Sequence, residues 1–249
     1  MKIILSGATG KMGHMIFDTL KNSKEHQIVA GYAAELDPDL PFPIYLNLNE
    51  CQEKESIDLI IDFSSPNSID HLLDFALENK IAMVIASTGF SNEQEDRIKK
   101  AADDIPILHS KNMSLGVNVM QILVEKMAAV LSDFDIEIIE KHHRYKKDSP
   151  SGTAKMLFES ANKGRQNKLH ELDGRAGIYD DRDINEVGIS AIRGGTIVGE
   201  HSVIFAGQDE ILEIKHTANS RAIFANGAIK AAEFLIKQKP GFYTMNDVL

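Results

Sequence analysis

Residues 2–13 read Lys-Ile-Ile-Leu-Ser-Gly-Ala-Thr-Gly-Lys-Met-Gly, and this stretch decides the fold. An apolar strand pattern runs into a turn with glycines at 7, 10 and 13, after which apolar residues recur at helical spacing. This order opens a dinucleotide-binding βαβ unit, because glycine lets the backbone approach a pyrophosphate and the helix start supplies amide hydrogens. The spacing is G-x-x-G-x-x-G, with Thr9 where the usual fingerprint has its second glycine, so a tight turn without a ligand stays open as an alternative.

Three further strand patterns follow this unit, at residues 57–63, 81–86 and 106–109, with helical patterns at 68–79 and 92–102 between them. Strands that alternate with helices predict a parallel sheet. Ligands of such sheets bind outside the carboxyl ends of the strands. The polar loops that follow these strands are therefore the expected ligand-binding edge.

The loop after a further strand pattern, at residues 27–32, should lie near the adenosine ribose of a bound dinucleotide. Glu35 is the nearest acid that could accept a hydrogen bond from a ribose hydroxyl of NAD. Lys11 could instead meet the 2'-phosphate of NADP. The sequence leaves the choice between the two cofactors open.

The pattern changes after residue 113. A helical pattern begins at Ser114, and four strand patterns follow it, three of them without helices between them; they cover residues 134–139, 186–193, 197–206 and 210–217. Strands in succession predict a smaller α+β domain with a mixed or antiparallel sheet. The polar, glycine-containing segment 164–182 is expected to be a long mobile loop.

The fold class predicted overall is α/β, with two domains. A Rossmann-like dinucleotide-binding domain should comprise residues 1–113 together with 222–249, since the helical pattern at 222–237 is expected to return to the first sheet. Residues 114–221 should form a substrate-binding and oligomerisation domain. With 249 residues, the chain is long enough for two cores.

Residues 141–154 read Lys-His-His-Arg-Tyr-Lys-Lys-Asp-Ser-Pro-Ser-Gly-Thr-Ala, within a chain of net charge -10. A local positive field in an acidic protein suits a small anion better than a nucleic acid, although such a run alone could be a solvated loop. The histidines and Lys146 are typical of proton transfer, because crowded cations disfavour further protonation of their neighbours. The turn at residues 151–153 could open a helix whose amides bind a carboxylate.

Several other classes of site and location are disfavoured by the sequence. Neighbouring cations repel a metal, so none is expected at His142 and His143. The single cysteine, Cys51, excludes an intrachain disulfide framework and is expected to be a buried or incidental thiol. No apolar run reaches the roughly 18 residues of a membrane span, and no signal-peptide pattern opens the chain, so a cytoplasmic location is expected.

The segment 135–154 closely resembles the signature of the bacterial 4-hydroxy-tetrahydrodipicolinate (dihydrodipicolinate) reductase family. Further blocks resemble the family in its own order along almost the whole chain; they are residues 7–13, 62–64, 87–89, 112–118, 193–201 and 224–228. The resemblance implies an oxidoreductase that uses NADH and/or NADPH to reduce 4-hydroxy-tetrahydrodipicolinate to tetrahydrodipicolinate, in the diaminopimelate route to lysine. It also implies a homotetramer built through the second domain.

Roles for individual residues follow from the same resemblance. Cofactor contacts would fall on Gly7, Ala8, Thr9, Gly10, Lys11 and Met12, on Ala86, Ser87 and Thr88, and on Ser110, Lys111, Asn112 and Met113. His142 would be the catalytic proton donor or acceptor and Lys146 a second proton donor. The carboxylates of the small cyclic substrate would be held by His143, Ser151, Gly152 and Thr153. Many family members carry an acid nearer the end of the second strand than Glu35, which leaves the cofactor preference undecided.

Two alternatives remain beside this assignment. A non-enzymatic NAD(P)-sensing Rossmann protein would keep the glycine turn but would not need the basic run, and a different oxidoreductase could act on another small acid. His201 and His216 are expected to be packed or hydrogen-bonded histidines. Arg193 and Lys215 are expected to be ordinary surface charges.

Overall fold

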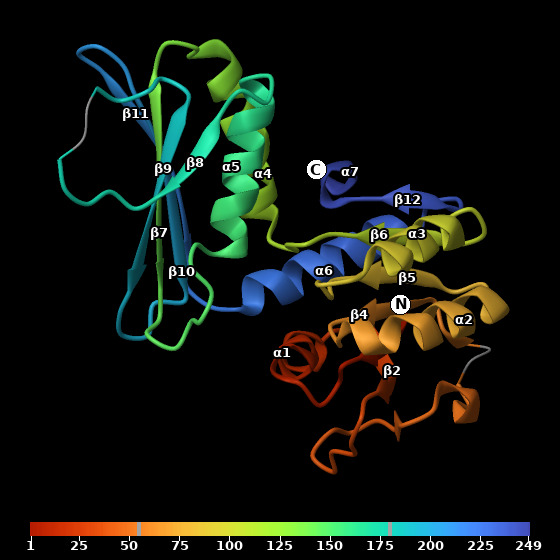
Figure 1. Ribbon diagram of the computed structural model, residues 1–249. Coiled ribbons are helices and arrows are strands. Elements are labelled where there is room, and N and C mark those ends of the chain that lie inside the picture. The colour runs from red at the N-terminus through yellow and green to blue at the C-terminus, as the bar shows by residue number, and fades with distance from the viewer. Residues whose placement is uncertain (54–55, 179–180) are drawn as a thin grey trace. The chain divides into compact units, whose positions relative to one another are not determined.

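The computed structural model describes residues 1–53, 56–178 and 181–249 (Figure 1). The chain divides into two compact units. The first unit comprises Met1–Leu115 together with Arg221–Leu249, and the second unit is Gly116–Ser220.

The first unit is built on a parallel sheet, sheet A. Its strands are β1 (Lys2–Ser6), β2 (Gln27–Tyr32), β3 (Ile44–Tyr45), β4 (Leu59–Asp62), β5 (Ala82–Ile85), β6 (Pro106–His109) and β12 (Gly241–Tyr243). They lie in the order β12-β6-β5-β4-β1-β2-β3, and all neighbouring pairs are parallel. The loops that follow β1, β4, β5 and β6 therefore emerge at one edge of the sheet.

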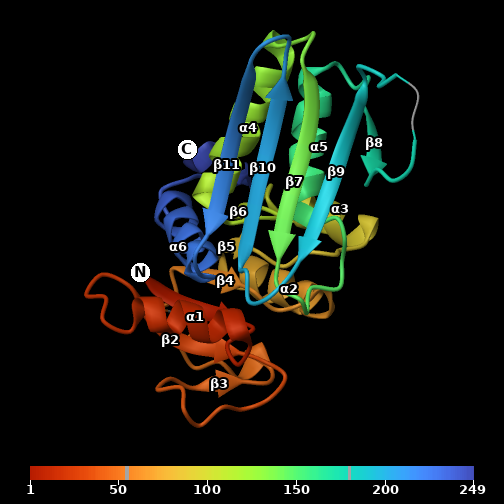
Figure 2. The ribbon, with the colours of Figure 1, turned by 90° about the vertical axis from the view of Figure 1, so that its left-hand side faces the viewer.

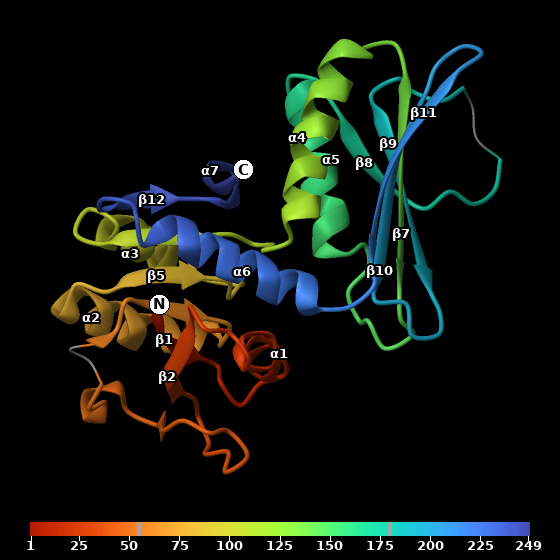
Figure 3. The same cartoon turned by 180° about the vertical axis from the view of Figure 1, so that it is seen from behind.

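Both faces of sheet A are covered by helices, as alternate residues of the interior strand β1 require. Ile3 and Leu5 of β1 belong to one buried cluster and Ile4 to another. The first cluster includes residues of α1 (Lys11–Leu20) and α6 (Ala222–Leu235), and the second includes residues of α2 (Ile69–Asn79) and α3 (Asn92–Ala101). Figure 3 shows α6 lying along the sheet beside β5 and β6. Short helices η1 (Leu48–Glu50), η3 (Pro66–Ser68) and α7 (Met245–Val248) complete the described helical elements of this unit.

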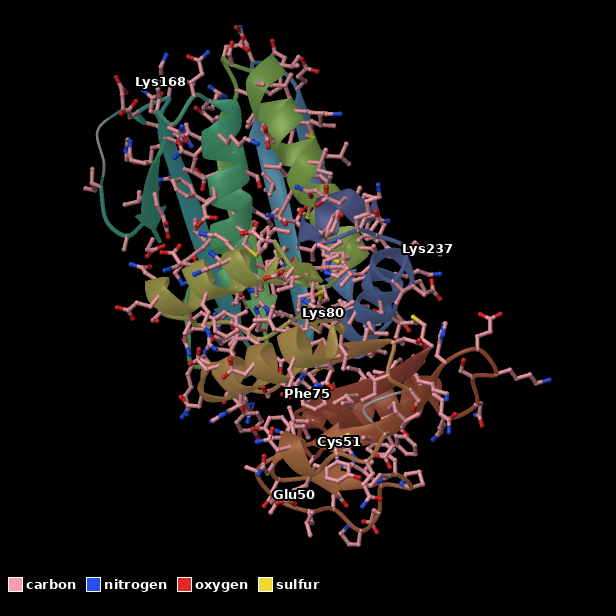
Figure 4. The ribbon with its side chains drawn as sticks, turned by 90° about the vertical axis from the view of Figure 1, so that its right-hand side faces the viewer. Glu50, Cys51, Phe75, Lys80, Lys168 and Lys237 are labelled. Carbon is pink, nitrogen blue, oxygen red and sulfur yellow. The ribbon has the colours of Figure 1, made fainter. Side chains whose placement is uncertain are left out.

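The single cysteine lies in the core of this unit. Cys51 is 3% exposed and follows η1, in the same buried cluster as Phe75 of α2 (Figure 4). Its thiol lies 3.6 Å from a carboxylate oxygen of Glu53. This placement confirms the expectation of a buried thiol.

The second unit contains a mixed sheet, sheet B. Its strands are β7 (Asp135–His142), β8 (His170–Asp173), β9 (Glu186–Arg193), β10 (Gly199–Ala206) and β11 (Ile211–Ala218). They lie in the order β11-β10-β7-β9-β8, where β10 is antiparallel to both neighbours and the pairs β7–β9 and β8–β9 are parallel. Helices α4 (Leu115–Val130) and α5 (Gly152–Gly164) lie behind one face of this sheet in Figure 2.

Strand β7 is the central strand of sheet B, and its side chains alternate strictly. Ile136, Ile138, Glu140 and His142 are buried, whereas the residues between them are only partly covered. Ile136 and Ile138 pack in one cluster with residues of α4 and α5, so the buried side of β7 is the side that the helices cover. Glu140 and His142 thus point to the same side of the sheet as the core.

The predicted fold class is confirmed, since a parallel Rossmann-like sheet and a mixed second sheet are both present. The prediction of one long loop at residues 164–182 is wrong at His170–Asp173, which forms the edge strand β8. Its sequence, His-Glu-Leu-Asp, is too polar to show a strand pattern. Residues 179 and 180 of that segment lie outside the described residues. Across the described ranges, the helices are too short or too polar to cross a membrane.

Candidate functional site

The structure gathers the predicted cofactor residues at one edge of sheet A. Residues 7–12 follow β1, residues 86–88 follow β5, and residues 110–113 follow β6. These three strands are parallel, so their carboxyl ends point to the same edge. This is the edge at which open parallel sheets bind nucleotides.

The turn after β1 is so tight that two of its positions require glycine. Gly7 has a φ of +76°, and a Cβ on it would lie 2.7 Å from the carbonyl oxygen of Phe63. A Cβ on Gly13 would lie 2.2 Å from the carbonyl oxygen of Ala8, so glycine allows α1 to pack against the turn. Helix α1 begins after Gly10 without a side-chain cap and without an acid in its first turn. Its amino terminus therefore suits an anionic phosphate.

A buried carboxyl group, that of Asp62 at the end of β4, connects two of the loops at this edge. Asp62 is 0% exposed. Its Oδ1 accepts hydrogen bonds from the amide of Ser64 at 3.1 Å and from the Ser64 hydroxyl at 2.5 Å, and its Oδ2 accepts one from the Ser87 hydroxyl at 2.6 Å. Ser87 therefore uses its hydroxyl to position the loop after β5, while its neighbour Thr88 is exposed.

The loop after β6 is held by its own polar groups. The Ser110 hydroxyl donates to the carbonyl oxygen of Asn112 at 2.9 Å and accepts from the Asn112 amide at 3.3 Å. The Asn112 side-chain oxygen in turn accepts from the amide of Ser114 at 2.9 Å. Lys111 is exposed at the tip of this compact turn.

The loop after β2 contains two acids that could approach a ribose. Glu35 is exposed, three residues beyond the end of β2 at Tyr32. Asp37 contacts the helix that follows the glycine turn, because its Oδ2 is 3.1 Å from Nε2 of His14 in α1. Residues 33–40 contain no lysine or arginine, which leaves Lys11 as the candidate for contact with a 2'-phosphate.

In the second unit, four hydrogen bonds converge on the buried carboxylate of Glu140. Arg193 donates from Nη1 to Oε2 at 2.8 Å and from Nη2 to Oε1 at 2.7 Å. The amide of Ser151 donates to Oε1 at 3.0 Å, and Nδ1 of His142 lies 2.6 Å from Oε2. Glu140 is 0% exposed, so these partners replace its water.

The pKa values in this cluster follow from burial and from these partners. Burial alone would raise the pKa of Glu140, but hydrogen bonds from Arg193 and His142 outweigh it and hold that pKa below its ordinary value. Burial lowers the pKa of His142, although the Glu140 carboxylate opposes this shift. Burial and the neighbouring His142 lower the pKa of His201 to about 4. Neutral imidazoles therefore predominate around Glu140 at neutral pH.

Helix α5 begins beside this cluster. The Ser151 hydroxyl accepts a hydrogen bond from the amide of Ala154 at 3.2 Å and lies 2.9 Å from Nε2 of His201. A Cβ on Gly152 would have no heavy atom within 4 Å, so the backbone is open at the first residue of the helix. Thr153 follows and is partly buried. An exposed helix start next to a histidine is a favourable place for a carboxylate.

The other predicted residues of the basic run lie in the turn after β7. Nζ of Lys146 is 2.9 Å from Oδ2 of Asp148, and the Lys146 side chain is 21% exposed. The amide of Lys146 donates to the carbonyl oxygen of His143 at 3.1 Å, which closes the turn. Nδ1 of His143 is buried and has no hydrogen-bond partner in the part of the chain that the structure describes.

Sequence reasoning missed the role of two residues. Arg193 was expected to be a surface charge, and this expectation is wrong because its guanidinium binds the buried Glu140. Glu140 precedes His142 by two residues on a strand, and this spacing puts both on one face, so it could have been found. His201 is buried and hydrogen-bonded, as expected. Lys215 pairs with Glu200 at 2.8 Å and is 46% exposed, which agrees with a surface charge.

Comparison with protein families gives one consistent match along the chain. Residues 1–113 match the family described as dihydrodipicolinate reductase, N-terminus, and residues 116–249 match dihydrodipicolinate reductase, C-terminus. A 4-hydroxy-tetrahydrodipicolinate reductase of Caldanaerobacter subterraneus subsp. tengcongensis is 48% identical over 100% of this chain and 98% of its own length. That of Clostridium novyi is 45% identical with the same coverage.

Solved structures show the same fold. A dipicolinate-bound dihydrodipicolinate reductase from Paenisporosarcina sp. TG-14 superposes with a TM-score of 0.82, at 21% identity, over 100% of this chain and 99% of that one. A diaminopimelate dehydrogenase of C. glutamicum reaches a TM-score of 0.58 at 12% identity, over 98% of this chain and 92% of its own. At these identities the likeness concerns the fold alone.

Proposed function

The chain belongs to the dihydrodipicolinate reductase family, and we propose how its two units divide the reaction of that family. The enzyme is an NAD(P)-dependent oxidoreductase that reduces 4-hydroxy-tetrahydrodipicolinate to tetrahydrodipicolinate, a step of the diaminopimelate route to lysine. The relatives that carry this name match the chain along its entire length, so the similarity includes both units.

The first unit holds the cofactor at the carboxyl edge of sheet A. When bound, the reduced nicotinamide supplies the hydride. The open turn at residues 7–12 receives the pyrophosphate on backbone amides, and the loops at 86–88 and 110–113 line the same edge. Support comes from Gly7 and Gly13, where any side chain would collide with backbone, and from the uncapped, acid-free start of α1.

The second unit holds the dicarboxylate at the start of α5. Amides of Gly152 and Thr153 bind one carboxylate together with the cap residue Ser151, and His143 adds a polar contact. The open space at Gly152 supports this assignment, since a substrate can approach the backbone there. The helix dipole adds a partial positive charge at the same place.

Hydride addition to an unsaturated ring leaves an electron-rich ring atom that must take up a proton. We assign proton transfer to His142, with Lys146 as a second donor. The observation that carries the assignment is the shared carboxylate: Glu140 contacts His142 and also the amide of Ser151. The proton-transferring ring is therefore adjacent to the helix start that binds the substrate.

The proposal includes a homotetramer that forms through sheet B. The face of this sheet opposite α4 and α5 presents isoleucines from four neighbouring strands; they are Ile139, Ile192, Ile204 and Ile211. Ile211 is 72% exposed and Ile192 is 46% exposed. Exposed isoleucines favour burial against another copy of the sheet, and charged residues of the same face, such as Glu213 and Lys215, lie beside them. Sedimentation equilibrium measures the assembly, and a monomer at micromolar concentration would contradict it.

Location in the cytoplasm is also part of the proposal, because the reaction consumes a reduced nicotinamide cofactor.

One assay tests the function as a whole. The purified chain is mixed with enzymatically generated substrate and NADH or NADPH, and absorbance of the reduced nicotinamide is followed. We expect turnover with at least one cofactor. Binding of cofactor without turnover would instead support an NAD(P)-sensing protein.

A further inference from the structure

We propose that Glu140 and Arg193 form a positioning pair that fixes the tautomer of His142 and anchors the start of α5, so that one carboxylate aligns the proton-transferring group with the substrate-binding turn. The inference rests on the proposed function, because it assigns these tasks to His142 and to residues 151–153. Neither Glu140 nor Arg193 needs to touch the substrate for this role.

The tautomer follows from the hydrogen bonds at Glu140. A carboxylate that receives two guanidinium N–H groups is ionised and can only accept. Nδ1 of His142, 2.6 Å from Oε2, must therefore carry the proton and donate it. In the neutral ring Nε2 is then the unprotonated atom, so a proton enters or leaves His142 at Nε2.

The second oxygen of the same carboxylate anchors the helix start. Oε1 accepts from the amide of Ser151, the residue that caps α5. The Ser151 hydroxyl oxygen accepts from the amide of Ala154 and shares a further hydrogen bond with Nε2 of His201, whose direction is set by the tautomer of that ring. Two bonds from Glu140 and His201 thus fix the residue that precedes Gly152.

Arg193 makes this use of a buried carboxylate tolerable. Without Arg193, the buried Glu140 carboxylate would bind a proton itself or stabilise the doubly protonated, cationic form of His142. Paired with Arg193, the carboxylate can orient the ring and still allow His142 to release its second proton. Arg193 reaches Glu140 because β9 runs parallel to β7 and places Arg193 beside His142 in the register. The fork of Arg193 also donates to the carbonyl oxygen of Asp148, which ties down the turn before α5.

The ring of His142 is confined on two further sides. His201 of β10 lies against it edge to face, with 5.1 Å between ring centroids. A Cβ on Gly199 would lie 3.1 Å from Nε2 of His142, so glycine leaves this nitrogen uncrowded. Glu140 therefore sets the tautomer of a ring whose position is already restricted.

Glu140→Gln is the central test. A glutamine amide has one acceptor oxygen, so it cannot receive both His142 and Ser151 as the carboxylate does, and its NH2 group opposes the donors of Arg193. Long-range proton–nitrogen NMR of the ¹⁵N-histidine-labelled full chain reports which nitrogen of His142 is protonated, with His142→Gln used to assign its signals. We expect protonated Nδ1 in the wild type and a mixed or reversed tautomer in Glu140→Gln. We also expect kcat to fall roughly 10- to 100-fold and KM for the substrate to rise.

Glu137→Gln is the matched control, because Glu137 lies on the same strand, pairs with Arg175 and Arg182, and faces away from His142. It should keep the wild-type tautomer and kcat. An unchanged tautomer and kcat in Glu140→Gln would overturn the inference, as would an equal change in both variants. If Glu140→Gln does not fold, Arg193→Lys takes its place, since it keeps the charge and loses the fork; a wild-type kcat there would also overturn the inference. Absence of turnover in the wild type contradicts the proposed function instead, because the tautomer is measured without substrate.

Discussion

Asp62 in the first unit and Glu140 in the second unit are both fully buried acids on central strands of their sheets. Their partners differ. Asp62 accepts hydrogen bonds from neutral donors, the amide and hydroxyl of Ser64 and the hydroxyl of Ser87. Glu140 accepts from the cationic Arg193, from a titratable histidine and from one amide.

This difference separates two uses of a buried carboxyl group. Neutral hydroxyl and amide donors hold loops in place and do not titrate near neutral pH, which suits the edge of the sheet that is proposed to bind the cofactor. A guanidinium and an imidazole bring charge and a mobile proton into the interior, which suits a site of proton transfer. Variants that change the charge should therefore have large effects around Glu140 and small effects around Asp62.

Loss of the guanidinium at Glu140 should give the largest effect. Arg193→Met leaves a buried carboxylate with only His142 and Ser151 as partners, and we expect a loss of about 3–5 kcal/mol in the free energy of unfolding. Urea unfolding at pH 8 measures it. The loss should shrink toward pH 6, because a protonated His142 then replaces part of the missing charge.

Arg97→Met provides the matched control for this prediction. Arg97 also binds two carboxylates, those of Asp70 and Asp74, but these side chains are 46% and 66% exposed. Because solvent screens such pairs, its removal should cost about 1 kcal/mol or less. Equal losses of unfolding free energy in Arg193→Met and Arg97→Met would mean that burial does not make the ion pair at Glu140 stronger than an exposed one.

Removal of the proton-transferring groups should give the next largest effect. His142→Gln and Lys146→Ala should each lower kcat by roughly 10²-fold, because a positioned acid or base is lost. Cofactor affinity, measured by fluorescence titration, should stay near the wild-type value. His26→Gln is a suitable control, since His26 also pairs with a glutamate, Glu233 at 3.0 Å, but precedes β2 at the opposite edge of sheet A. An unchanged kcat in both site variants would contradict the assigned roles.

The contrast between Asp62 and Glu140 was only partly predictable from the sequence. Asp62 ends an apolar strand and is followed by serines, a pattern that indicates a polar loop at a sheet edge. Glu140 and His142 share a face of β7 through period-2 alternation, which is a local signal. Both features depend on residues that are close in the chain, as do the glycine turn and most of the strands.

Other parts depend on long-range pairing and left no local signal. Arg193 reaches Glu140 over 53 positions of sequence, through the register of β7 with β9, and its own neighbours resemble a surface turn. Strands β3 and β12 have only two and three residues and form through pairing with longer neighbours. Tertiary contacts of this kind override local propensity.

Stability should depend on pH around Glu140, because its neighbourhood contains titratable rings. Burial lowers the pKa of His201 to about 4, while an unfolded histidine titrates near 6.5. Between these values the unfolded chain binds more protons, so this contribution is complete above pH 6.5 and is lost as the pH falls toward 4. The loss from His201 should reach about 2 kcal/mol between pH 7.5 and pH 5. Urea unfolding of His201→Gln should show a pH dependence that is weaker by this amount, and an identical dependence would contradict the shift.

Asp62→Asn should have the smallest effect and is the sharpest test of the contrast. An asparagine keeps one oxygen to accept from Ser64, and the Ser87 hydroxyl can rotate to accept from the new NH2 group, because a hydroxyl both donates and accepts. No cation is left unpaired by the change among the described partners of Asp62. We expect a loss of about 1 kcal/mol in urea unfolding, the value of one weakened hydrogen bond, and less than in Glu140→Gln, where an arginine fork faces an amide. A larger loss in Asp62→Asn than in Glu140→Gln would show that the charge of the donors is not what separates the two sites.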